Sequence, residues 1–425
     1  MGATERSQFL PFSRFALLQR LRQQPQWRDD EAAVERFLRQ FAALQHQHFR
    51  QQLHGLKRNF LPFSPDRDTQ VFIDYSVQQR EQMQHELLGA LKQLLEQANY
   101  DRITADDLDR LFSEASPYGL QLKVDLSEFA QMLLYSRGHD EVEKHYRHWK
   151  TLFLKKHVIT LPVYQRLFLL LKLKPVETRI GEIMQKEGIE RKKAEKKLKR
   201  YRQNLPDNIS GDHIIIKLFK NIPQADLEML FPNTQVKLKP FDKLKLGVTA
   251  GGGTIGSVTA TATKVAAAAN PMAAAGALAG LAAVVFRQVS KFFGQRTKYM
   301  MTLAQNLYFH NLANNRAALT LLVDRAEEEM FKNSLLAWFI LHRDGTAENE
   351  NALQQRIEDF IHQTFGLTVA FDIEAAIGSL REAGLIDAAR LAVVSPAEGC
   401  RILEAKWLEL LEDDSAFGED DGVEA

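Results

Sequence analysis

The feature that most constrains this sequence is a long, nearly uncharged stretch rich in glycine and alanine, residues 246–286. Its only charged side chain is Lys264. Asn270 and Pro271 lie in the middle, and this dipeptide favours a turn. Each half then has the length of a helix of about 20 residues, which can cross a hydrocarbon layer about 30 Å thick. The segment therefore predicts a helical hairpin that enters or crosses a bilayer.

Two further patterns support this prediction. Glycines four residues apart leave a strip of bare backbone that lets helices approach closely in lipid. Such pairs occur once in each half, at Gly252 and Gly256 and at Gly276 and Gly280. We expect these strips to pack the hairpin and to support a homo-oligomer.

Basic residues flank both ends of the segment: Lys243, Lys245, Arg287 and Lys291. The positive-inside rule places both flanks on the cytoplasmic side. We therefore expect a membrane-associated protein with most of its chain in the cytoplasm, at the inner membrane if the source is bacterial.

A different reading of the segment stays open. Alanine, glycine and threonine are only weakly apolar, and Lys264 would cost about 2.5–3.5 kcal/mol at the centre of a membrane helix. The same residues could form a buried alanine-rich helix pair or a flexible linker. Whether the hairpin spans constitutively or inserts conditionally also stays open.

The second candidate site is a basic amphipathic helix at residues 190–202. Ala194, Leu198 and Tyr201 give it a narrow apolar stripe. Its cationic residues are Arg191, Lys192, Lys193, Lys196, Lys197, Lys199, Arg200 and Arg202. Such a helix can contact anionic lipid headgroups or nucleic-acid phosphates, or can simply be a solvated face. Lipid ranks ahead of nucleic acid, because only Tyr201 could stack on a base.

Overall charge and cysteine content limit which ligands the protein can bind and which cellular compartment suits it. The chain has 55 basic and 54 acidic residues, so only a local patch can attract a polyanion. Its one cysteine, Cys400, excludes an intramolecular disulfide and suits a reducing compartment.

Periodicity predicts an α-dominated α+β protein. Residues 1–118 should be helical. Residues 119–242 should form a small, mostly antiparallel sheet domain, with strands at 120–126, 213–219 and 234–239. Two more strands are expected within 157–174, divided by Pro162. The hairpin with its flanks occupies 243–295, and an acidic tail, expected to be disordered, occupies 412–425.

Residues 296–411 predict a helical region with a winged-helix-like end. One helix should end at Gly366 and the next should start at Asp372. The wing is expected from LAVVS at 391–395 and from residues around Ile402. Because the second helix is acidic, we expect it to contact protein or to have a purely structural role, and not to bind DNA.

Catalytic motifs are missing from the sequence. It contains no H-E-x-x-H, P-loop, G-x-S-x-G or paired-cysteine pattern. His46 and His48 point to different helix faces, and Glu327, Glu328 and Glu329 are interpreted as a solvated helix face. We expect no enzyme, metal or cofactor. The prediction is a scaffold or regulator at a membrane, with a soluble nucleic-acid-binding protein or an unrecognised enzyme as alternatives.

Five blocks carry a family resemblance: PFSPDRDT at 62–69, ANYDRIT at 98–104, LLYSRG at 133–138, KLFKNIPQADLEMLFP at 217–232 and LYFHNLANNRAALTLLVDRAEEEMFKNSLLAWF at 307–339. Together they resemble the transmembrane protein 143 family, also called domain of unknown function 3754. The resemblance implies a bacterial or organellar membrane protein with a hydrophobic stretch between the last two blocks, and it implies no catalytic residue.

Overall fold

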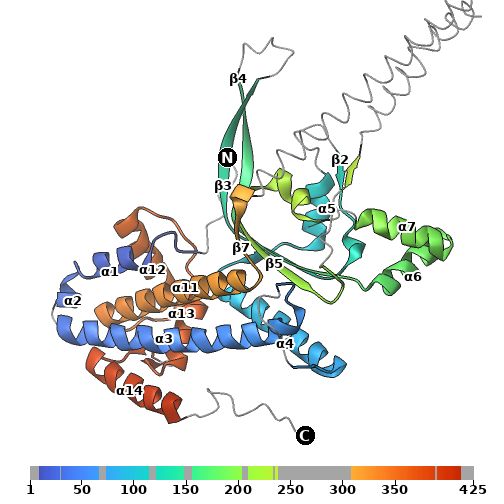
Figure 1. Ribbon diagram of the computed structural model, residues 1–425. Coiled ribbons are helices and arrows are strands. Elements are labelled where there is room, and N and C mark those ends of the chain that lie inside the picture. Colours follow the sequence, from blue (N-terminus) through green and yellow to red (C-terminus); the bar gives the residue numbers. More distant parts are fainter. Residues whose placement is uncertain are drawn as a thin grey trace, which may run out of the picture.

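The computed structural model describes residues 9–28, 30–66, 73–113, 121–147, 156–202, 209–232, 235–237, 308–387 and 390–412. It is rich in helices and carries a five-stranded antiparallel sheet beside a helical body (Figure 1). The predicted hairpin at 246–286 and its basic flanks lie outside these residues. Among the residues described, no helix combines the length and the apolar character that a membrane span requires.

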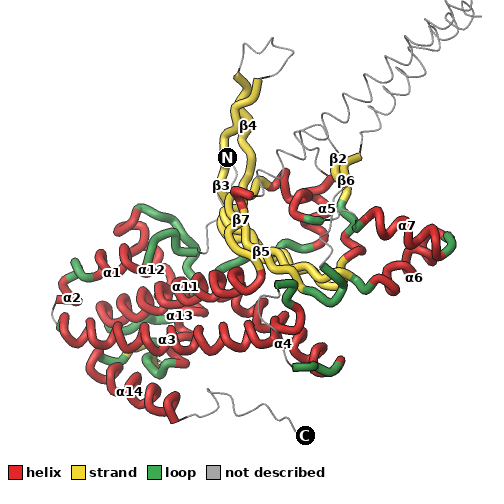
Figure 2. The backbone as a smooth tube through the Cα atoms, viewed as in Figure 1, coloured by secondary structure: helices red, strands yellow, loops and turns green. Residues whose placement is uncertain are grey.

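The main sheet has the strand order β1-β3-β4-β5-β7, and all neighbouring strands are antiparallel. Figure 2 shows β3 and β4 as a long twisted ribbon. The strands are β1 (Asp101–Arg102), β3 (Phe129–Arg147), β4 (Lys156–Leu173), β5 (Ile214–Pro223) and β7 (Asn311–Asn314). Two small pairs accompany them, β2 (Gln121–Lys123) with β6 (Gln235–Lys237) and β8 (Ile386–Asp387) with β9 (Ala392–Val393).

Apolar side chains cover both faces of the sheet. Along β4, Phe168 and Leu170 pack into a core with the helices α3 (Glu31–Phe60), α4 (Val77–Gln97) and α11 (Asn315–Asp344). Leu167 and Leu169 pack into a second core on the opposite face. A strand buried on both faces needs apolar residues at every position. This explains why β4 reads as a continuous leucine-rich run.

The expectation that Pro162 divides two strands is wrong, because β4 runs through it as one strand. Pro162 pairs with Glu141 of β3, and β5 pairs with β4 only from Val163 onward. At Pro162 the strand therefore has a neighbour on one side only. Proline is tolerated in such an edge position, where its missing N–H is not required. The strand β3, which the sequence did not predict, is the strand that pairs with β4 at this position.

Helices from both ends of the chain share one core. The helices are α1 (Arg14–Leu21), α2 (Pro25–Arg28), α3 (Glu31–Phe60), α4 (Val77–Gln97), α5 (Ala105–Ser113), α6 (Val176–Glu187), α7 (Arg191–Tyr201), α11 (Asn315–Asp344), α12 (Glu350–Phe365), α13 (Ile373–Glu382) and α14 (Pro396–Glu412). In the core, Phe37 of α3 packs on Trp338 of α11 with ring centroids 4.7 Å apart. Leu380 of α13 belongs to the same cluster.

Several predicted helix ends are confirmed. Helix α12 stops at Gly366, which takes the left-handed conformation that glycine favours. Helix α13 starts at Asp372, whose carboxylate accepts a hydrogen bond from the N–H of Ala375. The expectation that residues around Ile402 form a wing is wrong, because Ile402 lies within α14. The strand pair β8–β9 follows α13 instead.

Asn315 connects the sheet to the start of α11. Its backbone has a φ of 48°, a left-handed conformation that asparagine tolerates better than most residues. Its side-chain oxygen accepts a hydrogen bond from the N–H of Ile216 at 3.0 Å, and its amide donates to Asp66 at 2.8 Å. This asparagine therefore satisfies buried backbone at the junction of β5 and α11.

The segment after β5 is the 3₁₀ helix η4 (Gln224–Leu230). It covers the second face of the sheet through Leu227 and Leu230. Asp226 and Glu228 are also buried in it, and burial raises the pKa of Glu228 to about 7.

This shift makes stability depend on pH. The folded protein holds the proton of Glu228 more tightly than the unfolded chain, so stability falls as pH rises from about 4.5 to about 7. We expect Glu228→Gln to be about 1–3 kcal/mol more stable than wild type near pH 8 and similar to it below about pH 5. Urea unfolding at both pH values measures this. Glu374→Gln, at an exposed site on α13, is the control. A loss of stability in Glu228→Gln at both pH values would contradict the prediction.

Candidate functional site

The predicted basic helix is α7, and it forms a helical hairpin with α6. The two helices share a small core of Ile180, Ile183, Ala194 and Leu198. Gly188, with a φ of 63°, ends α6 and allows the tight reversal. The predicted apolar stripe therefore faces α6, which leaves the cationic side chains pointing away from the hairpin core.

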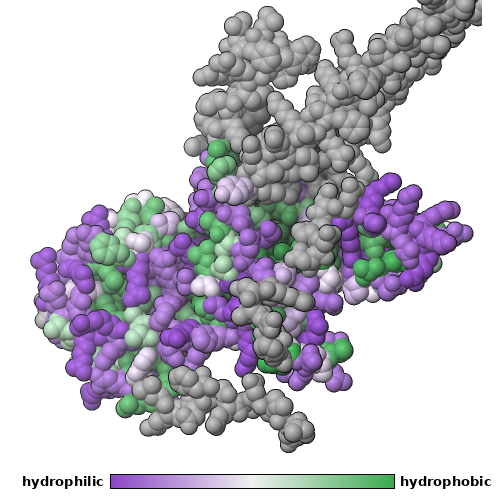
Figure 3. All heavy atoms as spheres, in the orientation of Figure 1, coloured by the Kyte–Doolittle hydropathy of each residue, from purple (hydrophilic) through white to green (hydrophobic). Residues whose placement is uncertain are grey.

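Three of the eight predicted cations are held by carboxylates of the protein itself. Arg191 pairs with Glu177 and Glu195, Lys197 with Glu187, and Arg202 with Glu128. The other five are exposed, and no carboxylate pairs with them among the described residues: Lys192, Lys193, Lys196, Lys199 and Arg200. Figure 3 shows a strongly hydrophilic surface over α6 and α7. We call these five residues the cationic face.

A buried ionic cluster fixes the α6–α7 hairpin to the sheet. Glu128, the last residue of the short 3₁₀ helix Leu126–Glu128 directly before β3, is 1% exposed. It accepts from Arg179 Nε at 2.9 Å and from Arg202 Nε at 2.8 Å. Arg179 also donates to Asp125 at 2.7 Å and to Glu182 at 2.9 Å. A hydrogen bond from Lys174, together with Arg179, holds the pKa of Glu182 below its usual range. The cluster gives the cationic face a defined position on the protein.

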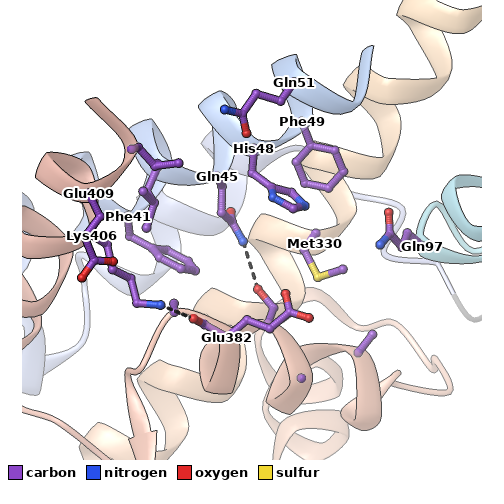
Figure 4. A pocket seen from close by; sticks show the side chains of 16 residues that line it. Phe41, Gln45, His48, Phe49, Gln51, Gln97, Met330, Glu382, Lys406 and Glu409 are labelled. Carbon is purple, nitrogen blue, oxygen red and sulfur yellow. Dashed lines mark hydrogen bonds between the residues drawn. The ribbon is translucent and has the colours of Figure 1, made fainter. Parts of the chain in front are cut away.

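A cavity of about 570 Å³ lies between α3, α11, α13 and α14 (Figure 4). Phe41, Phe49 and Met330 give it apolar walls. The side-chain amide of Gln45 donates to Ser379 at 3.2 Å, while its buried oxygen has no hydrogen-bond partner. Such a cavity suits a small apolar molecule that carries a hydrogen-bond donor.

The polar groups around this cavity do not form a nucleophile–base pair in the region described. His48 bonds Gln52 and Ser379 bonds Gln45, so the histidine and the serine have different partners. Within the described ranges, no group of three His, Cys, Asp or Glu side chains could hold a metal ion. The Nδ1 atom of His46 lies 3.1 Å from a carboxylate oxygen of Glu327.

The interpretation of Glu327, Glu328 and Glu329 as a solvated face is wrong for Glu329, which is 1% exposed. Glu329 accepts from Arg137 at 2.9 Å and from Lys332 at 2.7 Å, and these two cations are buried as well. Burial lowers the pKa of Lys332, while Glu329 opposes the shift. One signal was present in the sequence: Lys332 follows Glu329 by three residues, a spacing that brings two side chains together on a helix.

The other predicted site residues lie outside the described residues. These are the glycine pairs Gly252–Gly256 and Gly276–Gly280 and the flanks Lys243, Lys245, Arg287 and Lys291. Their packing and membrane roles stay predictions.

Comparison with known proteins matches one part of the chain to a family. The model of the family described as "Protein of unknown function (DUF3754)" matches residues 164–317. No solved structure matches the chain. The matched region runs from β4 through α7 to the first turn of α11. It therefore supports the assignment of this protein to an uncharacterised family.

Proposed function

We propose that this protein is a non-catalytic scaffold or regulator that docks on anionic lipid surfaces through the cationic face of α7. The observation that carries the proposal is the set of five exposed cations, which pair with no carboxylate of the described part of the chain. They lie on a hairpin that buried ions attach to the sheet. Each Lys or Arg near an anionic membrane contributes about 1 kcal/mol of attraction. Five such residues on one short helix give substantial binding without a specific pocket.

The Gly/Ala-rich segment would supply the second membrane contact. In this proposal, residues 246–286 insert as a helical hairpin and associate through their glycine strips, while α7 contacts the anionic lipid headgroups. The chain would then share the membrane character of the transmembrane protein 143 family. Its bulk would stay on the cytoplasmic side.

The C-terminal helices would serve as the protein-contact module. Helices α12 and α13 followed by the antiparallel pair β8–β9 have the element order of a winged helix. Glu374 and Glu382 make α13 acidic, which disfavours DNA. The acidic surface of α13 therefore favours binding to a partner protein.

Charge reversal on α7 tests the lipid proposal. We expect the full chain carrying Lys192→Glu, Lys196→Glu and Lys199→Glu to bind phosphatidylserine-containing vesicles at least about 100-fold more weakly than wild type, since three attractions of about 1 kcal/mol are lost. Vesicle flotation at low salt measures the binding. Pure phosphatidylcholine vesicles show how much binding does not depend on charge.

The matched control changes net charge by the same amount at another place. Arg50, Arg58 and Lys92 are exposed on α3 and α4, and no ion pair holds them among the described residues. If binding depends on the cationic face and not on the net charge of the protein, reversing these three charges should leave vesicle binding within about threefold of wild type. Equal losses in both variants, or RNA binding with no vesicle binding in wild type, would refute the lipid proposal.

A further inference from the structure

A second cavity, of about 370 Å³, lies between the sheet and α11, and residues 9–13 form one of its walls. Its charged lining residues are Arg137, Arg166, Arg325, Lys332, Glu328 and Glu329. Among the described lining residues, four cations therefore face two carboxylates, which leaves an excess of positive charge.

Most of these charges are already paired. Glu329 binds Arg137 and Lys332, and Glu328 pairs with Arg325 at 3.0 Å. Arg166 differs, because its guanidinium donates only to the backbone oxygen of Gln165, at 2.7 Å. Among the described residues, no carboxylate lies within ion-pair distance of Arg166.

The sheet places Arg166 between other cations. It lies directly opposite Arg137 on β3 and opposite Lys220 on β5. Like charges at directly opposed positions destabilise a sheet. Burial lowers the pKa of Arg166; Tyr100 opposes this shift, while Arg325 and Arg137 add to it. An anion between these side chains would remove the repulsion.

We propose that this cavity binds a dianionic oxygen ligand of the phosphomonoester type, with Arg166 as its principal contact and Arg325 and Arg137 beside it. The planar guanidinium matches two phosphate oxygens at once, and Arg is the side chain best suited to such bidentate binding. Two negative charges would balance the excess of cations in the lining. The buried ring of Tyr100 and the side chain of Phe9 leave an apolar border for the rest of the ligand.

Phosphate-dependent stabilisation tests this site on the full chain. We expect inorganic phosphate to raise the melting temperature of wild type in a saturable manner, above the effect of chloride at equal ionic strength. Arg166→Met should bind phosphate about 10- to 100-fold more weakly by calorimetry, because it loses the charged hydrogen bonds. Arg102→Met, at an exposed site on β1 outside the cavity, should keep the phosphate response.

The phosphate-free melting temperature separates ligand binding from folding. Arg166→Met removes a like-charge contact, so its melting temperature without phosphate should equal or exceed that of wild type. Three results would overturn the inference: equal melting of wild type in phosphate and chloride, a retained phosphate response in Arg166→Met, or lower stability of that variant without any anion. The test does not involve vesicles, so its outcome is independent of the lipid proposal.

Discussion

Replacing Glu329 with alanine should destabilise the protein by about 3–5 kcal/mol, because the change leaves buried cations without their shared counter-ion. Arg137 and Lys332 both depend on this carboxylate, at 2.9 and 2.7 Å. Neither cation can reach water easily, since their side chains are 9% and 2% exposed. Chemical unfolding monitored by circular dichroism measures the loss.

The same substitution should release the N-terminal segment. The N–H of Leu10 donates to Glu329 at 3.1 Å, and Lys332 donates to the backbone oxygens of Leu10 and Phe12 at 2.7 and 3.0 Å. Without Glu329, the N–H of Leu10 loses its partner and Lys332 its counter-ion. We therefore expect proteolysis near residues 9–13 to become faster in Glu329→Ala than the global loss of stability alone explains.

Two neighbouring carboxylates provide the controls. Glu327 and Glu328 lie on the same turn of α11, and their side chains are 19% and 28% exposed. Because partly exposed ion pairs contribute little, Glu327→Ala and Glu328→Ala should each cost no more than about 1 kcal/mol. If Glu329→Ala loses as little stability as these two variants, then Arg137 and Lys332 do not depend on Glu329 as their counter-ion, and the prediction is wrong.

Local sequence signals predicted the helices better than the sheet. The caps at Asp372 and Gly366 depend on residues within one turn of the helix end, so the sequence contains them completely. The strand β3 includes the polar run His139–Lys144, which resembles a loop when taken alone. It is a strand because β4 pairs with it along almost its whole length. Such long-range pairing has no local signature.

The candidate site shows the same division. The pattern of residues 190–202 predicted α7 and two of the three residues of its apolar stripe, Ala194 and Leu198, because both follow from helical spacing. The third, Tyr201, is not part of the hairpin core. Which cations stay free could not be predicted, since Glu128, Glu177 and Glu187 come from other elements. Arg202 in particular was expected to contact lipid, but it is partly buried and paired with Glu128. The row of cations formed by Arg137, Arg166 and Lys220 was also missed, because these residues come from three different strands.

The substitution Arg179→Met should detach α6 and α7 from the sheet. Arg179 is 4% exposed and is bonded to three carboxylates, those of Asp125, Glu128 and Glu182. Methionine keeps an unbranched apolar stem but leaves the carboxylates close together. The nearby cations that remain are Arg202, Lys174 and Lys186. Breaking a buried ion pair in this way costs about 3–5 kcal/mol.

We expect this cost to fall mainly on the α6–α7 hairpin, because its own core holds only the four buried residues Ile180, Ile183, Ala194 and Leu198. Regions with few buried apolar contacts open at lower free energy than the rest of a protein. Hydrogen exchange should therefore accelerate roughly 100-fold or more in α6 and α7, while amides in the α3–α11 core change much less. Lys192→Met, an exposed change on α7 that also removes one cation, should leave exchange in both regions as in wild type. If α6 and α7 in Arg179→Met exchange as slowly as in wild type, the ionic cluster does not hold the hairpin, and the defined position of the cationic face needs another cause.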